Sequence, residues 1–197
     1  MVYLYIADIS GLSDPLECPR LMEELPVERQ QKIARHKQTD KRMQSFGAGL
    51  LLNRVLEKHG VSVDTLRVDA GGKPNADGIC FNLSHSGAYV ICAVSTKPVG
   101  CDIEQIKNAP KQIEERAFSQ EERALLKGLD NDAYNHEFYR MWTQKESFLK
   151  MQGFGLRVPL QTLEMEGCYF KEYERPGYQV TVCAEENEFA ELTWQII

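Results

Sequence analysis

The 197-residue sequence lacks the patterns that mark several common protein classes. Its six cysteines include no CxxC pair and its four histidines have no metal-ligand spacing, so neither a zinc site nor a disulfide framework is indicated. No apolar run approaches the roughly 20 residues of a membrane helix, and the N-terminus lacks the basic start and apolar core of a signal peptide. We therefore expect a reduced, cytoplasmic protein with buried thiols and no membrane segment.

Signatures of several enzyme classes are also missing. The chain contains no GxSxG nucleophile elbow, no GxxxxGK[ST] loop and no GxGxxG dinucleotide motif. Ser84 and His85 are adjacent, so on an extended strand their side chains point to opposite faces, which argues against a Ser–His dyad. A net charge of −6 does not indicate an extended nucleic-acid interface, although a local basic patch is compatible with it.

The apolar pattern that is present predicts an α+β fold. Helical spacing predicts long helices over residues 40–59 and 134–152, and a capping-box pattern predicts another helix start at Ser119–Glu122. Each half of the chain combines one long helix with several strands, so we expect two similar halves, 1–98 and 99–197. Strands are predicted over residues 2–9, 66–68, 79–83, 88–94, 100–104, 160–165, 168–174, 178–184 and 190–197.

Two of these predicted elements carry acidic residues at suggestive positions. Glu146 and Lys150 are four residues apart on the second long helix, at the edge of its apolar stripe. Asp102 and Glu104 lie two residues apart on a predicted strand and therefore share a face. Three carboxylates on two rigid elements suit a hard cation such as Mg²⁺, whereas a simpler interpretation is surface carboxylates and an ordinary helix ion pair.

Basic residues gather just before the first long helix and in its first turn. By composition alone this segment is a solvated helical face, but it also suits a phosphate-binding rim. Lys73 on a glycine turn and the Ser84-His85-Ser86 tip between two apolar runs are further candidates for a ligand site. The basic side chains of the segment are Arg29, Lys32, Arg35, Lys37, Lys41 and Arg42.

Five short motifs, taken together, resemble 4′-phosphopantetheinyl transferases, and most closely the surfactin-synthetase-activating (Sfp-like) branch. They occur in the order and at the separations of that family, and the similarity covers roughly residues 25 to 160. The motifs are GKP (Gly72–Pro74), FNLSHS (Phe81–Ser86), GCDIE (Gly100–Glu104), FS..E (Phe118–Glu122) and FYRMWTQKESFLK (Phe138–Lys150).

The resemblance implies an intramolecular pseudo-dimer of two α/β halves, each a small antiparallel sheet on a long helix. It implies a magnesium-dependent transferase that moves the 4′-phosphopantetheine group of coenzyme A to a serine of an apo acyl or peptidyl carrier protein and releases adenosine 3′,5′-bisphosphate. Residues 1–98 would bind the phosphate and adenine side of coenzyme A, and residues 99–197 would provide the metal site and the carrier-protein side. A monomer is expected, since the two halves already pair within one chain.

Matching motif positions imply the residue roles. Asp102, Glu104 and Glu146 would hold Mg²⁺, and Asp102, Glu146 and Lys150 would be the catalytic groups. The expected coenzyme A contacts are Arg42, Lys73, Ser84, His85, Lys150, Arg29 and Lys32.

Two positions depart from the family pattern: Met43 replaces a small polar residue, and Cys101 replaces an aliphatic one. Two other functions stay open at this point. One is a non-catalytic paralogue that binds coenzyme A or a carrier protein, and the other is a metal-dependent phosphohydrolase.

Overall fold

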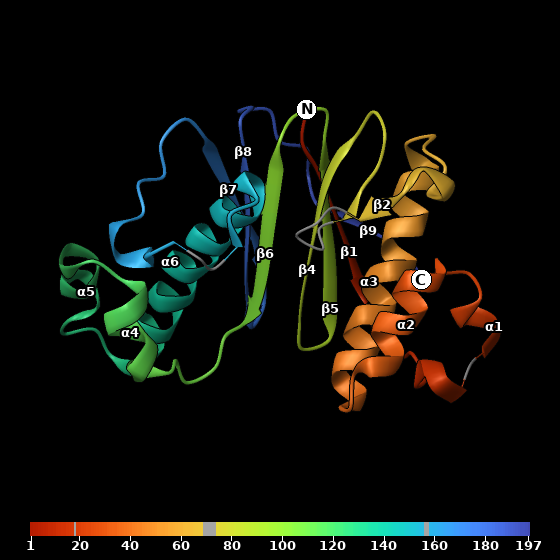
Figure 1. The fold of residues 1–197 in the computed structure, drawn as a ribbon. Helices are drawn as coiled ribbons and strands as arrows, with labels where there is room; N and C mark the ends of the chain where they lie inside the picture. The colour runs from red at the N-terminus through yellow and green to blue at the C-terminus, as the bar shows by residue number, and fades with distance from the viewer. Residues whose placement is uncertain (18, 69–73, 156–157) are drawn as a thin grey trace.

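The computed structural model shows two small β-sheets packed face to face, each covered on its outer side by helices (Figure 1). It describes residues 1–17, 19–68, 74–155 and 158–197. The first sheet has the order β4-β5-β1-β9, with β1 (Tyr3–Asp8), β4 (Cys80–Ser86), β5 (Tyr89–Ser95) and β9 (Thr193–Trp194). The second has the order β6-β8-β7, with β6 (Val99–Gln105), β7 (Tyr169–Arg175) and β8 (Tyr178–Ala184).

One long helix lies against the outer face of each sheet (Figure 1). Helix α3 (Thr39–Lys58) packs on the first sheet and α6 (Asn131–Gln152) on the second. The α+β fold with two small sheets and long helices is therefore confirmed. The shorter elements are α1 (Pro19–Met22), α2 (Val27–Arg35), α4 (Lys111–Ala117), α5 (Gln120–Leu126), the pair β2 (Arg67–Val68) and β3 (Pro74–Asn75), and 3₁₀ turns at Pro15–Glu17, Val63–Thr65 and Leu160–Thr162.

Strand alternation explains why β1 and β5 are apolar along almost their whole length. Side chains alternate between the two faces of a strand, and here both faces are buried. On β1, Leu4 and Ile6 enter the core between the sheets, whereas Tyr5 and Ala7 enter the core under α3. On β6, Cys101 and Ile103 take the inter-sheet positions. The other face of β6 consequently turns its side chains toward α6.

The end of the chain returns to the first sheet. β9 pairs in parallel with β1, so the first sheet includes residues from both ends of the sequence. The guanidinium of Arg175, on β7, lies 4.3 Å from the ring centroid of Tyr89 on β5 and 4.8 Å from that of Trp194 on β9. These cation–π contacts tie the second sheet to the first. The proposed boundary at residues 98 and 99 remains a prediction.

Most predicted helix limits agree with the structure. Ser119 and Glu122 form the predicted capping box, and α6 ends at Gly153, whose φ of 74° is in the left-handed region that glycine tolerates. The strand predicted over residues 160–165 is wrong. Leu160–Thr162 form a 3₁₀ turn, and the Leu160 carbonyl accepts a hydrogen bond from the buried Lys145 ammonium at 2.6 Å instead of pairing with a strand.

Candidate active site

The acidic face of β6 reaches α6 because Gly100 has no side chain. A Cβ atom at this position would lie 1.9 Å from the Ser147 carbonyl oxygen and 2.5 Å from the Met151 amide nitrogen. The strand therefore packs directly on the helix backbone. Asp102 and Glu104 follow at the next two positions on the same face. The glycine thus brings their strand close to the helix that carries Glu146 and Lys150.

Asp102 and Lys150 form the central ion pair of this site. The Lys150 Nζ donates to Asp102 Oδ1 at 2.6 Å and to Ser84 Oγ at 3.0 Å, and Ser84 Oγ donates to Asp102 Oδ1 at 2.8 Å. Asp102 is buried, whereas the Lys150 side chain is 28% exposed. Burial by itself would lower the pKa of Lys150, but the neighbouring Asp102 outweighs it and the pKa is raised, so Lys150 stays an ammonium.

The other two carboxylates are held in an environment that disfavours negative charge. Burial is the main cause that raises the pKa of Glu104 and of Glu146. Asp102 raises both values further, and Glu104 also raises that of Glu146, against the opposing effect of Lys150. Three carboxylates that repel one another at the junction of β6 and α6 are stabilised by any cation bound between them.

The donor set fits a hard divalent cation in chemical type. Carboxylate oxygens are the preferred ligands of Mg²⁺, and Asp102 Oδ2 is buried without a hydrogen-bond partner in the part of the chain that the structure describes. In that part, no three His, Cys, Asp or Glu side chains form a ready-made cation site. Lys150, which pairs with Asp102 Oδ1, supplies the positive charge there. Asp102, Glu104 and Glu146 are thus the residues that could hold the metal.

A basic cavity of about 160 Å³ lies beside β4. Arg29, Lys32, Asn82 and His85 are among the residues that line it. Loss of solvation is the main cause that lowers the pKa of His85 to about 4, with Lys41, Lys150 and Lys32 adding to the effect, although His85 is an exposed residue. His85 is therefore neutral at pH 7 and can offer a phosphate a hydrogen bond but no charge.

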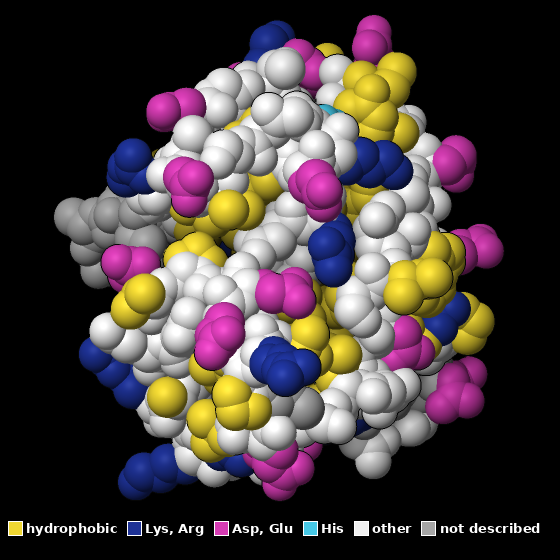
Figure 2. Space-filling model, turned by 90° about the vertical axis from the view of Figure 1, so that its right-hand side faces the viewer, with side chains coloured by type: hydrophobic (Ala, Val, Ile, Leu, Met, Phe, Trp, Pro, Cys, Tyr) yellow, Lys and Arg dark blue, Asp and Glu magenta, His cyan; other side chains and the backbone are white. Residues whose placement is uncertain are grey.

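Arg29 and Lys32 also border a larger groove of about 690 Å³, together with Arg35, Arg67 and apolar residues. Burial lowers the pKa of Arg29, and burial and Arg29 lower that of Lys32. Four cations and one carboxylate, that of Glu28, line this groove, so its net positive charge suits an anionic ligand. Figure 2, which looks onto the side of the molecule where α2 and α3 lie, shows Lys and Arg interspersed with Asp, Glu and hydrophobic side chains, so the positive charge is local.

The guanidinium of Arg42, by contrast, is already paired with other groups of the protein. It forms an ion pair with Asp14 and donates to the carbonyls of His36 and Lys37 at 3.0 and 3.1 Å. The hydrogen bond with Asp14 is the main cause that raises the pKa of Arg42. A phosphate contact from Arg42 would require it to give up some of these bonds. Lys73, the predicted turn lysine, lies outside the described residues.

Lys145, next to Glu146 in the sequence, has a structural environment. Its side chain is only 2% exposed, and Nζ donates to Glu122 Oε2 at 2.7 Å and to the Leu160 carbonyl. Glu122 Oε2 also accepts from the Ser119 amide at 2.7 Å. One carboxylate therefore caps α5 and pairs with α6, which links the FS..E and WTQKESF motifs physically.

We expect Lys145→Met to lower the free energy of unfolding by about 2–4 kcal/mol, because it leaves the Glu122 carboxylate partly buried without its cation. Adding Glu122→Gln should recover part of this loss, since glutamine keeps the cap without the charge. Urea unfolding of the two single variants and the double variant measures the coupling. Additive losses in the double variant would show that the pair does not interact.

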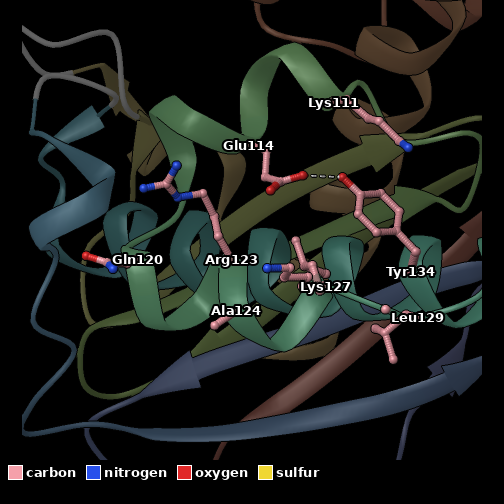
Figure 3. Close-up of a pocket in the computed structure, with 10 residues that line it drawn as sticks. Lys111, Glu114, Gln120, Arg123, Ala124, Lys127, Leu129 and Tyr134 are labelled. Carbon is pink, nitrogen blue, oxygen red and sulfur yellow. Dashed lines mark hydrogen bonds between the residues drawn. The ribbon is translucent and has the colours of Figure 1, made fainter.

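A separate groove of about 630 Å³ lies along α4, α5 and the start of α6 (Figure 3). Lys111, Arg123 and Lys127 give it positive charge. Figure 3 shows the Tyr134 hydroxyl directed at Glu114, to which it donates a hydrogen bond of 2.7 Å. Burial and the Glu114 carboxylate raise the pKa of Tyr134 to about 12. The groove therefore combines exposed cations with the apolar side chains of Leu126 and Leu129.

Three residues near the site received no individual role from the sequence. Lys41 influences the pKa values of both His85 and Glu104, Ser86 donates to Glu104 Oε2 at 2.8 Å, and Lys145 forms the buried pair described above. Ser86 had a signal, because it shares a face of its strand with Ser84. Lys41 belongs to the basic segment, but nothing distinguished it from the other cations there, and nothing distinguished Lys145 from an ordinary surface lysine.

Comparison with known proteins gives a consistent picture. A family model for the 4′-phosphopantetheinyl transferase superfamily matches residues 98–196. The 4′-phosphopantetheinyl transferase Sfp of Bacillus subtilis (strain 168) is 32% identical in an alignment 198 residues long. The alignment covers 89% of this chain and 88% of the relative. The 4′-phosphopantetheinyl transferase ffp of Bacillus subtilis is 35% identical over 199 residues, with the same two coverages.

A solved structure, the holo-[acyl-carrier-protein] synthase of Thermotoga maritima, aligns with part of the chain. The alignment covers 44% of this chain and 61% of that chain, with 18% sequence identity and a TM-score of 0.36. No helix in the described ranges is both long and apolar enough to cross a membrane.

Proposed function

The chain belongs to the 4′-phosphopantetheinyl transferase superfamily, and from this premise we propose that it transfers the 4′-phosphopantetheine group of coenzyme A to a serine of an apo acyl or peptidyl carrier protein. Adenosine 3′,5′-bisphosphate is the second product. The observation that carries the proposal is the meeting of β6 and α6, where Asp102 and Lys150 pair beside two further carboxylates and next to a basic cavity. Phosphoryl transfer requires both acidic groups for a metal and cations for phosphates.

In this proposal Asp102, Glu104 and Glu146 hold Mg²⁺. When bound, the metal neutralises charge on the pyrophosphate of coenzyme A. Support comes from the orphaned Asp102 Oδ2 and from the mutual repulsion of the carboxylates. Lys150 stays charged and stabilises negative charge that develops on the phosphates.

The transfer step replaces one P–O bond with another. The carrier serine oxygen forms a bond to the phosphorus that carries pantetheine, and the bond from that phosphorus to the bridging oxygen breaks. The electron pair leaves with adenosine 3′,5′-bisphosphate. Glu146, or a water beside it, accepts the serine proton, and its raised pKa suits a general base. The protein contributes positioning and electrostatics without a covalent intermediate.

We assign residues 1–98 to the phosphate and adenine side of coenzyme A and residues 99–197 to the metal and the carrier protein. Arg29, Lys32 and neutral His85 are favoured as phosphate contacts because they line the cavity beside β4. Ser84 joins them through Lys150, with which it shares a hydrogen bond. Arg42 and Lys73 complete the proposed set, Arg42 only if it releases part of its bonding to Asp14.

The groove along α4 and α5 is our candidate for the carrier-protein surface. Its cations Lys111, Arg123 and Lys127 suit an acidic partner, and the exposed Leu129 suits a small apolar contact. We further propose a monomer that acts in the cytoplasm.

The test incubates the protein with coenzyme A, Mg²⁺ and a panel of apo-carrier proteins, and follows the mass of each carrier. We expect one carrier or more to gain a single phosphopantetheine, and we expect chelation by EDTA to stop the reaction and added Mg²⁺ to restore it. Turnover of coenzyme A without any carrier would instead indicate a phosphohydrolase. Binding of coenzyme A without mass gain on any carrier would indicate a non-catalytic paralogue.

A further inference from the structure

The seam between the two halves is closed by side chains of β4 that reach the backbone of β6. The two strands belong to different sheets. Alternate residues of β4 nevertheless accept hydrogen bonds from alternate amides of β6, as neighbours in a sheet would. Asn82 Oδ1 accepts from the Cys101 amide at 3.0 Å, Ser84 Oγ from the Ile103 amide at 3.4 Å and Ser86 Oγ from the Gln105 amide at 3.0 Å.

Ser84 and Ser86 each form a second hydrogen bond. Each hydroxyl has one proton to donate after accepting from the backbone, and each gives it to a carboxylate of β6. Ser84 donates to Asp102 Oδ1 and Ser86 donates to Glu104 Oε2, both at 2.8 Å. Each serine is therefore fixed by an amide of β6 and in turn fixes the carboxylate one residue before that amide.

Holding one oxygen of a carboxylate determines where the other oxygen lies. At Asp102, Oδ1 is taken by Ser84 and Lys150, and Oδ2 stays buried with no hydrogen-bond partner among the described groups. At Glu104, Oε2 likewise accepts a hydrogen bond from Ser86. Outer hydrogen bonds of this kind orient metal-binding carboxylates and prevent them from turning away.

We propose that Ser86 is a positioning residue that holds Glu104 in the orientation needed to bind the divalent cation. The inference rests on the proposed function, but it concerns a residue to which that function gives no role. Ser86 acts through Glu104 and need not touch coenzyme A. A purely structural alternative is that Ser86 only joins β4 to β6, in which case its loss affects stability and leaves the affinity for metal unchanged.

The experiment compares the full-length wild-type protein with Ser86→Ala and Ser86→Thr. Mn²⁺ serves as the probe because oxygen donors bind it as they bind Mg²⁺, and its binding is followed by the electron paramagnetic resonance of free Mn²⁺, with and without coenzyme A. Ser86→Thr retains the hydroxyl and is compatible with a strand. Ser95→Ala is the matched control, because Ser95 also accepts a hydrogen bond from a backbone amide, that of Lys97, at 3.2 Å. Ser95 is on β5 opposite Cys80, at the end of the β4–β5 pair that is far from Ser86.

We expect Ser86→Ala to weaken Mn²⁺ binding about tenfold and to lower kcat at saturating coenzyme A, with Ser86→Thr close to wild type and Ser95→Ala unchanged. Thermal unfolding of all variants shows whether the fold is kept. A Ser86→Ala protein with unchanged Mn²⁺ affinity overturns the inference, whether its melting temperature falls or not. So does a wild-type protein that transfers phosphopantetheine but binds no Mn²⁺, whereas absence of transfer in the wild type counts against the proposed function itself.

Discussion

Replacement of Asp102 by asparagine is expected to lower kcat/KM for phosphopantetheine transfer by about 10³-fold or more, equivalent to roughly 4 kcal/mol of transition-state stabilisation. Asparagine has nearly the same shape, and its amide oxygen can still accept from Ser84 and Lys150. It loses the negative charge, however, and places an NH₂ group where the orphaned Oδ2 lies. A donor at this point repels a cation, so metal binding is lost although the side chain still fits.

Asp102→Asn also removes the anionic partner of Lys150. The Lys150 side chain is 28% exposed and can be solvated, so we expect a loss of stability of only about 1–2 kcal/mol and a folded protein. The rates come from initial formation of holo-carrier protein over a series of coenzyme A concentrations, with circular dichroism as the check on folding.

The matched control for this variant is Glu172→Gln. Glu172 is an exposed carboxylate on β7 of the same sheet, and it contacts α6 through Gln144 and Arg140. Removing its charge changes the surface of the same sheet and helix without touching the site, so transfer should proceed as in the wild type. A folded Asp102→Asn protein that keeps more than about a tenth of wild-type activity would exclude Asp102 from the metal site.

Local sequence patterns predicted the two elements that carry the acidic residues. A helical period places Glu146 one turn before Lys150, and a strand period places Asp102 and Glu104 on one face, because each relation depends only on backbone geometry within a single element. The capping box at Ser119 and the glycine that ends α6 are equally local. Features that depend only on neighbouring residues within one element can be predicted without knowing the tertiary fold.

The rest of the site depends on contacts between distant segments. Arg42 pairs with Asp14, which is 28 residues away, and no local rule reveals that this particular arginine of the basic segment is the one already neutralised. Ser86 meets Glu104 only because β4 and β6 pack together across two different sheets. The failure to predict the turn at Leu160–Thr162 has the same origin, since Lys145 binds its carbonyl from a helix earlier in the chain.

Replacement of Gly100 by alanine is expected to cost about 4 kcal/mol or more of folding free energy, with a fall in melting temperature of about 10 °C or more. The new Cβ would lie 1.9 Å from the Ser147 carbonyl oxygen and 2.5 Å from the Met151 amide nitrogen. Both are backbone atoms of α6, near its C-terminal end, so no side-chain rotation relieves the overlap. Ordinary overpacking costs about 1–3 kcal/mol because side chains adjust, and here β6 and α6 themselves must separate.

The separation caused by Gly100→Ala acts on the site as well as on stability. Lys150 Nζ and Asp102 Oδ1 are 2.6 Å apart, on the two elements that would be forced away from each other. Any Gly100→Ala protein that folds at low temperature should therefore have lost most of its transfer activity. Gly11→Ala is the control, because a Cβ there meets no atom within 4 Å, and its melting temperature should match the wild type. Differential scanning calorimetry of the three proteins decides the matter: equal melting temperatures for Gly100→Ala and Gly11→Ala would mean that β6 does not rest on the α6 backbone as described.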